Sequence, residues 1–88
     1  MKIRVLFTPN FIRDYKKLPH SLQEEVKEKI ELFKMDPKHP LLKSHKLSGK
    51  LKGTFSFWVN YRYRVVFVYD SKNTAALLGV GDHDVYKD

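Results

Sequence analysis

The chain has 88 residues, which is enough for one domain with one small core and excludes a separate cofactor domain. Hydrophobic residues make up 42% of the chain, too many for a disordered protein, yet no apolar run approaches the roughly 20 residues of a membrane span. The absence of cysteine excludes disulfides, zinc–thiolate sites and thiol catalysis, and the N-terminal segment lacks signal-peptide features. We therefore expect one domain over residues 1–88, located in the cytoplasm.

The charge of the chain is positive and unevenly distributed. Seventeen lysines and arginines against ten acids give a formal net charge of +7. No acid occurs from Pro37 to Tyr69, whereas the acids gather in the segment 24–31 and near the C-terminus. An acid-free basic stretch favours a polyanionic partner such as nucleic acid, the alternative being an ordinary solvated surface.

The first third of the chain begins with a predicted strand and a predicted helix. In the segment 2–7 the residues Ile3, Val5 and Phe7 alternate with Arg4 and Leu6, and β-branched residues are present, which is typical of a strand. Thr8 is then the expected N-cap of a helix, with Pro9 at its first position. One face of this helix is formed by three apolar residues at helical spacing: Phe11, Tyr15 and Leu18.

A second helix is expected after Pro19, which makes the two helices a hairpin. Ser21 is its predicted N-cap because Glu24 follows at the spacing of a capping box. The pair Asp36–Pro37 ends the helix. Its predicted buried stripe consists of Leu22, Val26, Ile30 and Phe33.

The second half of the chain predicts short strands. A short strand is expected near residues 45–47, and three more follow Gly53, over residues 55–59, 63–69 and 75–80. The segment 63–69 is almost continuously apolar, which suits a central strand buried on both faces. The order β-α-α-β-β-β therefore predicts an α+β fold: a small antiparallel-rich sheet of about four strands, with the N-terminal helical hairpin packed on one face.

Arg64 is a charged residue within the predicted central strand. A guanidinium cannot be buried without partners, so it must reach a carboxylate, a chain end or solvent. One interpretation is an ion pair with Asp82 or Asp84. The other is a phosphate clamp, for which the bidentate guanidinium is better suited than an ammonium.

Two histidines are candidate acid–base groups. His83 lies between two aspartates, which favour the protonated ring of a general acid, and His45 lies in a lysine-rich segment. One histidine that accepts a proton and one that donates it suffice to cleave RNA. The alternative is that both are ordinary surface residues. No metal-ligand spacing is present, so we expect neither a metal nor a cofactor.

Aromatic residues in the second half of the chain could stack on unpaired bases. The alternative is that they belong to the core, because aromatic residues at alternating strand positions usually do. The candidates are Trp58, Tyr61, Tyr63 and Tyr86.

Four segments together resemble the RelE/ParE toxin superfamily of bacterial and archaeal toxin–antitoxin systems over nearly the whole chain. They are residues 11–18 (FIRDYKKL), 47–53 (LSGKLKG), 63–67 (YRVVF) and 79–86 (GVGDHDVY). The sequence is most similar to the YafQ branch, which carries a histidine ahead of Leu-x-Gly, matched by His45, and a terminal Gly-x-His, matched by residues 81–83. Trp58 stands where that branch tends to have another histidine.

The resemblance implies a metal-independent mRNA endoribonuclease, or mRNA interferase, that acts on ribosome-bound message and leaves a 2′,3′-cyclic phosphate and a 5′-hydroxyl. It also implies a cognate acidic antitoxin, contact with rRNA, no membrane, and DNA contact only through the antitoxin complex. The alternative is a ParE-like DNA gyrase inhibitor or an inactive relative that only binds an antitoxin. The catalytic candidates are His45, Arg64, His83 and Tyr86, and the RNA-binding candidates are Lys43, Lys46, Lys50, Lys52 and Arg62.

Overall fold

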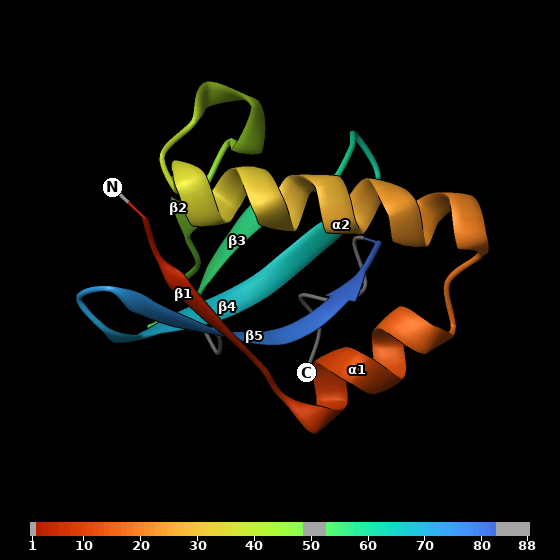
Figure 1. Cartoon of the computed structure of the whole chain (residues 1–88), viewed down its shortest axis with the longest axis horizontal. Coiled ribbons are helices and arrows are strands. Elements are labelled where there is room, and N and C mark those ends of the chain that lie inside the picture. Colours follow the sequence, from red (N-terminus) through yellow and green to blue (C-terminus); the bar gives the residue numbers. More distant parts are fainter. Residues whose placement is uncertain (1, 49–52, 83–88) are drawn as a thin grey trace.

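The computed structural model describes residues 2–48 and 53–82. The strands in these ranges form one mixed sheet (Figure 1). The elements in chain order are β1 (Arg4–Phe7), α1 (Pro9–Lys16), α2 (His20–Met35), the 3-10 helix η1 (Pro40–Leu42), β2 (His45–Lys46), β3 (Phe55–Trp58), β4 (Arg64–Ser71) and β5 (Thr74–Gly81). The strands lie in the order β1-β5-β4-β3-β2, with β1 parallel to β5 and the other neighbours antiparallel. The predicted α+β class is confirmed, and the described residues form five strands rather than about four.

Helix α1 continues along β5 where β1 ends. Thr8 caps α1 as predicted, because its Oγ1 accepts a hydrogen bond from the Phe11 amide at 3.2 Å. The same hydroxyl donates to the Leu77 carbonyl at 2.7 Å. Further along, the Asp14 carboxylate accepts a hydrogen bond from the Val80 amide at 3.2 Å. Polar groups of α1 therefore satisfy the edge of β5 that β1 leaves uncovered.

Helix α2 starts earlier than the capping-box spacing predicts, so the assignment of Ser21 as N-cap is wrong. The helix begins at His20, with Pro19 at the N-cap position and no side-chain cap. The Pro19 carbonyl accepts hydrogen bonds from the amides of Leu22 and Gln23, both at 3.0 Å. Proline already has a φ angle that suits the start of a helix, so the helix begins at His20, two residues sooner than an N-cap at Ser21 predicts. No helix in the described ranges is long and apolar enough to cross a membrane.

The core lies between α2 and the face of the sheet that α2 covers (Figure 1). The predicted stripe is confirmed, since its four residues are all buried: Leu22, Val26, Ile30 and Phe33. The Phe33 ring stacks on Phe57 at a centroid distance of 4.7 Å and meets the Phe67 ring edge-on at 4.8 Å. This aromatic cluster joins α2 to β3 and β4.

Strand β4 is buried on both faces over its first half, as its continuous apolar run predicts. Phe67 faces α2, and Val65 shares that side because strand residues two apart lie on the same face. Arg64 and Val66 lie on the opposite face of the sheet and are also buried, at 6% and 5% exposed. The sheet therefore has a second face, turned away from α2, whose central strand presents a buried cation.

The aromatic cluster predicts where the fold is most sensitive to truncation. Phe33→Ala removes a fully buried ring and should lower the free energy of unfolding by about 3–5 kcal/mol. Met35→Ala, on the same helix but 58% exposed, should change it by less than about 0.5 kcal/mol. Urea denaturation followed by circular dichroism measures both. Equal losses in the two variants would contradict the assignment of Phe33 to the centre of the core.

Candidate functional site

Three functional candidates share the face of the sheet turned away from α2. His45 pairs with Ser56 across β2 and β3, and Trp58 pairs with Arg64 across β3 and β4. Paired residues in antiparallel strands point to the same side, and Ser56 and Trp58 are two residues apart on β3. His45, Trp58 and Arg64 are therefore displayed on one face.

Arg64 is held by its own hairpin loop. Its Nη1 donates to the carbonyls of Asn60 at 2.7 Å and Tyr63 at 3.1 Å, and its Nη2 donates to the Tyr61 carbonyl at 3.1 Å. Its partners within residues 2–48 and 53–82 are thus backbone carbonyls, which the sequence does not predict, while Asp84, one of the two expected ion-pair partners, lies outside these ranges. The loop thus satisfies the buried guanidinium, and the guanidinium in turn fixes the loop.

Trp58 connects this arginine to a lysine. The guanidinium carbon of Arg64 lies 4.0 Å from the centroid of the Trp58 ring, and Lys43 Nζ lies over the same ring at 5.0 Å. Both contacts are within the distance of a cation–π interaction, for which tryptophan is the strongest aromatic partner. The Trp58 indole on this face is therefore in contact with two cations.

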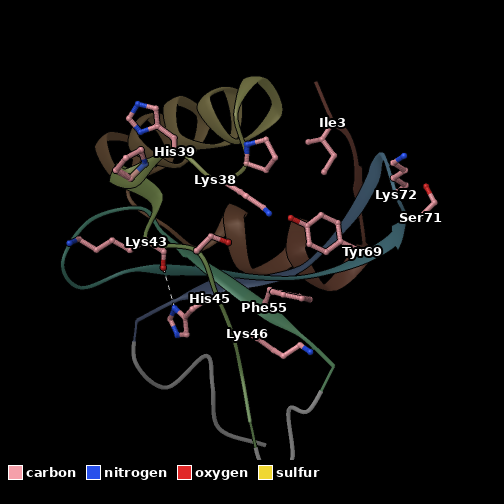
Figure 2. A pocket seen from close by; sticks show the side chains of 13 residues that line it. Ile3, Lys38, His39, Lys43, His45, Lys46, Phe55, Tyr69, Ser71 and Lys72 are labelled. Atoms are coloured by element: carbon pink, nitrogen blue, oxygen red, sulfur yellow. Dashed lines mark hydrogen bonds between the residues drawn. The ribbon is translucent and has the colours of Figure 1, made fainter. Parts of the chain in front are cut away.

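Lys43 also connects the indole to His45. Its backbone is left-handed, with φ 45° and ψ 42°, where the chain leaves η1. Its carbonyl oxygen lies 3.1 Å from His45 Nδ1, the contact drawn in Figure 2. Lys43, His45, Trp58 and Arg64 thus form one continuous group, which we call the Trp58 cluster.

The loop before β4 is fastened to α2. The Asn60 side-chain oxygen accepts hydrogen bonds from the amides of Arg62 and Tyr63, both at 2.9 Å. Its amide nitrogen reaches the Glu25 carboxylate at 3.3 and 3.4 Å. The exposed Arg62 guanidinium lies 5.9 Å from the centroid of the Tyr63 ring. The fixed loop therefore holds both Arg62 and the partners of Arg64 in place.

The remaining predicted site residues do not all join the Trp58 cluster. Lys46 follows His45 on β2 and points to the other face, where its Nζ lies 5.9 Å from the centroid of the Phe55 ring. Four residues fall outside the described ranges: Lys50, Lys52, His83 and Tyr86. Within those ranges no group of three or more histidine, aspartate or glutamate residues could hold a metal ion.

The central position of Trp58 is the main feature that the sequence did not reveal. The indole was one of several stacking candidates, and the alternation of Phe57 and Trp58 could indicate only that it faces away from the core. Its contacts with Lys43 and Arg64 depend on the pairing of β3 with β4 and on the turn after η1. Neither feature leaves a signal in residue spacing.

Solved toxin structures share this fold. YafQ from E. coli strain BL21(DE3) matches with a TM-score of 0.79 over 99% of this chain and 100% of its own, at 14% identity. The toxin–antitoxin complex RelBE2 from Mycobacterium tuberculosis matches with a TM-score of 0.73 at 29% identity, over 94% of this chain and 100% of that chain. The YoeB/ParE toxin from Agrobacterium tumefaciens matches with a TM-score of 0.74 at 20% identity, over 92% and 99%. No protein-family model and no curated protein sequence matches the chain.

These matches cover nearly the whole of both chains, so those toxins share the fold described above, in which α2 covers one face of the sheet and α1 lies along β5. The chain has the fold of the RelE/ParE toxin superfamily, and the resemblance to that superfamily, including a YafQ-like relative, is confirmed.

The hydrogen bonds of Arg64 predict a stability effect that the neighbouring arginine lacks. Arg64→Lys leaves a buried cation that cannot reproduce the planar fork, so the free energy of unfolding should fall by about 1–3 kcal/mol. Arg62→Lys, at an exposed position of the same loop, should change it by less than about 0.5 kcal/mol. Urea denaturation followed by circular dichroism compares the two variants. An Arg64→Lys protein as stable as the wild type would show that the carbonyl contacts do not stabilise the fold.

Proposed function

We propose that the chain is the toxin of a toxin–antitoxin pair and that it cleaves messenger RNA, on ribosome-bound message in the cytoplasm. The observation that carries this proposal is the Trp58 cluster, which places an imidazole, an indole and two cations on one face of a RelE/ParE fold. Those groups match the needs of RNA cleavage: proton transfer, a stacking surface for a base and positive charge for the phosphate.

The proposed reaction uses the 2′-hydroxyl of the RNA as its nucleophile. His45 accepts the hydroxyl proton, the 2′-oxygen attacks the adjacent phosphorus, and the bond from phosphorus to the 5′-oxygen breaks. His83 donates a proton to the leaving 5′-oxygen, so that the products are a 2′,3′-cyclic phosphate and a 5′-hydroxyl. Because a carbonyl only accepts hydrogen bonds, the contact between His45 Nδ1 and the Lys43 carbonyl supports a proton on Nδ1 and leaves Nε2 as the accepting atom.

Arg64 supplies positive charge for the phosphorane-like transition state in this proposal. Its guanidinium is held by three carbonyls, so its charge needs little reorganisation as negative charge develops on the phosphoryl oxygens. Tyr86 stacks on or orients the scissile nucleotide. The remaining basic candidates hold the backbone of the message or of rRNA: Lys43, Lys46, Lys50, Lys52 and Arg62.

An acidic antitoxin is the proposed protein partner. The net charge of +7 and the acid-free stretch from Pro37 to Tyr69 favour an acidic chain that neutralises the toxin by covering the basic face and the helical hairpin. The matched RelBE2 structure is itself a toxin–antitoxin complex. DNA would then be contacted only through that complex.

Substitution of the proposed acid tests the enzymatic proposal. His83→Gln keeps hydrogen-bonding capacity but cannot supply a proton at neutral pH, so single-turnover cleavage of ribosome-bound message should fall by about 10²–10⁴-fold. Arg64→Ala should also lower the rate by about 10²-fold or more. His20→Gln, at the start of α2, should cleave like the wild type. Circular dichroism confirms that each variant is folded.

Two outcomes would contradict the proposal. A His83→Gln protein that cleaves at the wild-type rate would remove the histidine mechanism. A wild-type protein that leaves ribosome-bound message intact and inhibits DNA gyrase would be a ParE-like inhibitor instead.

The antitoxin proposal predicts toxicity that a neighbouring gene relieves. Expression of the chain alone should arrest growth of the host cell, and co-expression with a small acidic protein encoded beside it should restore growth and give a stable complex. Growth curves and size-exclusion chromatography measure the two effects. If the chain is expressed alone without slowing growth of the host cell, and if it does not bind the neighbouring gene product, it is not a toxin.

A further inference from the structure

A second basic site lies across β2 from the Trp58 cluster. It is a pocket of about 900 Å³ between the segment 37–46 and the ends of β3 and β4 (Figure 2). This volume is within the range of about 300–1,000 Å³ that is typical of ligand sites. No acid lines the pocket, whereas six basic or imidazole residues do: Lys38, His39, Lys43, His45, Lys46 and Lys72.

The loop that forms the wall of the pocket is anchored in the core. Leu42 of η1 is fully buried, at 0% exposed, and its amide donates to the His39 carbonyl at 3.0 Å. The His39 ring accepts a hydrogen bond from the Leu41 amide at 3.1 Å. Two acids adjoin lining residues in sequence: Asp36, which uses a carboxylate oxygen on the Lys38 amide at 3.3 Å, and Asp70, between Tyr69 and Ser71. Neither lines the pocket, so the residues that do line it carry positive and no negative charge.

Aromatic side chains form the floor of the pocket. The Tyr69 ring, 38% exposed, meets the Phe55 ring edge-on at a centroid distance of 5.2 Å. Figure 2 shows the Tyr69 hydroxyl and the Lys38 ammonium pointing into the same space between the loop and the sheet. Burial raises the pKa of Tyr69 above its usual value, so its hydroxyl stays protonated and is a hydrogen-bond donor at neutral pH. The basic groups and the Tyr69 hydroxyl thus favour an anion. The aromatic floor favours a ligand that also has a flat, apolar portion.

We propose that this pocket is a second RNA subsite, which holds one nucleotide beside the nucleotide bound at the Trp58 cluster. The base lies against Tyr69 and Phe55, and its phosphate is held by the lysine ammonium groups. This proposal rests on the proposed function for its ligand class. Aromatic stacking combined with cations is the pattern that binds single-stranded nucleic acid, whereas an acidic peptide would need only the cations.

The shortness of β2 makes the two subsites continuous. The strand has only two residues, and its side chains point to opposite faces: His45 toward the Trp58 cluster and Lys46 over Phe55 in the pocket. A single strand of RNA that crosses the outer edge of β2 would therefore contact both. Lys43 and His45 line the pocket and also belong to the Trp58 cluster, so the two subsites adjoin through these residues.

Binding of an RNA that cannot be cleaved tests the base contact. The probe is a fluorescein-labelled hexauridylate with 2′-O-methyl groups, which lacks the nucleophile, and anisotropy reports its affinity. Tyr69→Leu should weaken binding by about 5- to 150-fold, the effect of one lost base stack, while Tyr69→Phe should keep binding within about threefold of the wild type. Photocrosslinking of the same hexamer with 5-bromouracil, followed by mass spectrometry, should label Tyr69 or Phe55 in the unmutated protein. A crosslink pattern confined to residues outside the pocket would overturn the proposal, even if Tyr69→Leu fails to fold.

The phosphate contacts are tested with a charge-matched control. The double variant Lys38→Gln, Lys72→Gln should reduce the slope of log affinity against log salt by about 1.4, from about 0.7 per phosphate contact. The control Lys16→Gln, Lys17→Gln removes the same charge from α1 and its end, outside the pocket, and should reduce the slope by less than half as much. Equal effects of the two double variants would overturn the proposal, since a general basic surface would explain them.

The remaining outcomes separate this proposal from the proposed function. If the wild type cleaves message and the pocket variants bind the hexamer as tightly as the wild type does, the subsite alone is overturned. A wild type that binds the hexamer through the pocket but cleaves no message would support the subsite and contradict the catalytic proposal. Polyglutamate that binds through Tyr69, Lys38 and Lys72, when the hexamer does not, would assign the pocket to an acidic protein segment and overturn the RNA subsite.

Discussion

The contact of Phe33 with Phe57 and Phe67 is the interaction on which the rest of the molecule depends. An 88-residue chain can build only one core, and here a single ring of α2 reaches the phenylalanines of two neighbouring strands. Because α2 covers one face of the sheet, strand alternation directs every second residue of β3 and β4 to the other face. The functional candidates can therefore be polar without disturbing the core.

Arg64 shows how the two faces of the sheet are connected. Its neighbour Val65 belongs to the core, and its own guanidinium lies under the opposite face, bound to the carbonyls of the preceding loop. That loop is fastened to α2 through Asn60 and Glu25. The position of α2 thus determines the loop, the loop determines the guanidinium, and the guanidinium lies against Trp58. The residues that stabilise this part of the fold are therefore also residues of the proposed chemistry.

The features that local patterns encode were predicted from the sequence. The Thr8 cap, the buried stripe of α2 and the doubly buried run of β4 depend on neighbours a few residues away, so spacing alone reveals them. The start of α2 at His20 was missed, because a backbone carbonyl and not a side chain closes its first turn. The partners of Arg64 among the described residues are carbonyls as well. Because every residue has a backbone carbonyl, residue type cannot reveal which ones the guanidinium binds. The basic pocket unites four separate segments, and only the folded sheet brings them together.

The pairing of β1 with β5 has a consequence for how the protein folds. Arg4 lies opposite Thr74, and Thr8 binds the Leu77 carbonyl, so in the described part of the chain the first strand pairs with a strand far away in sequence. Pairing across such a separation is slow to nucleate, because the intervening chain must be brought together before the contact forms. Until β5 is in place, Arg4–Phe7 has no sheet edge to join. We therefore expect the addition of β1 to be a late step in the assembly of the sheet.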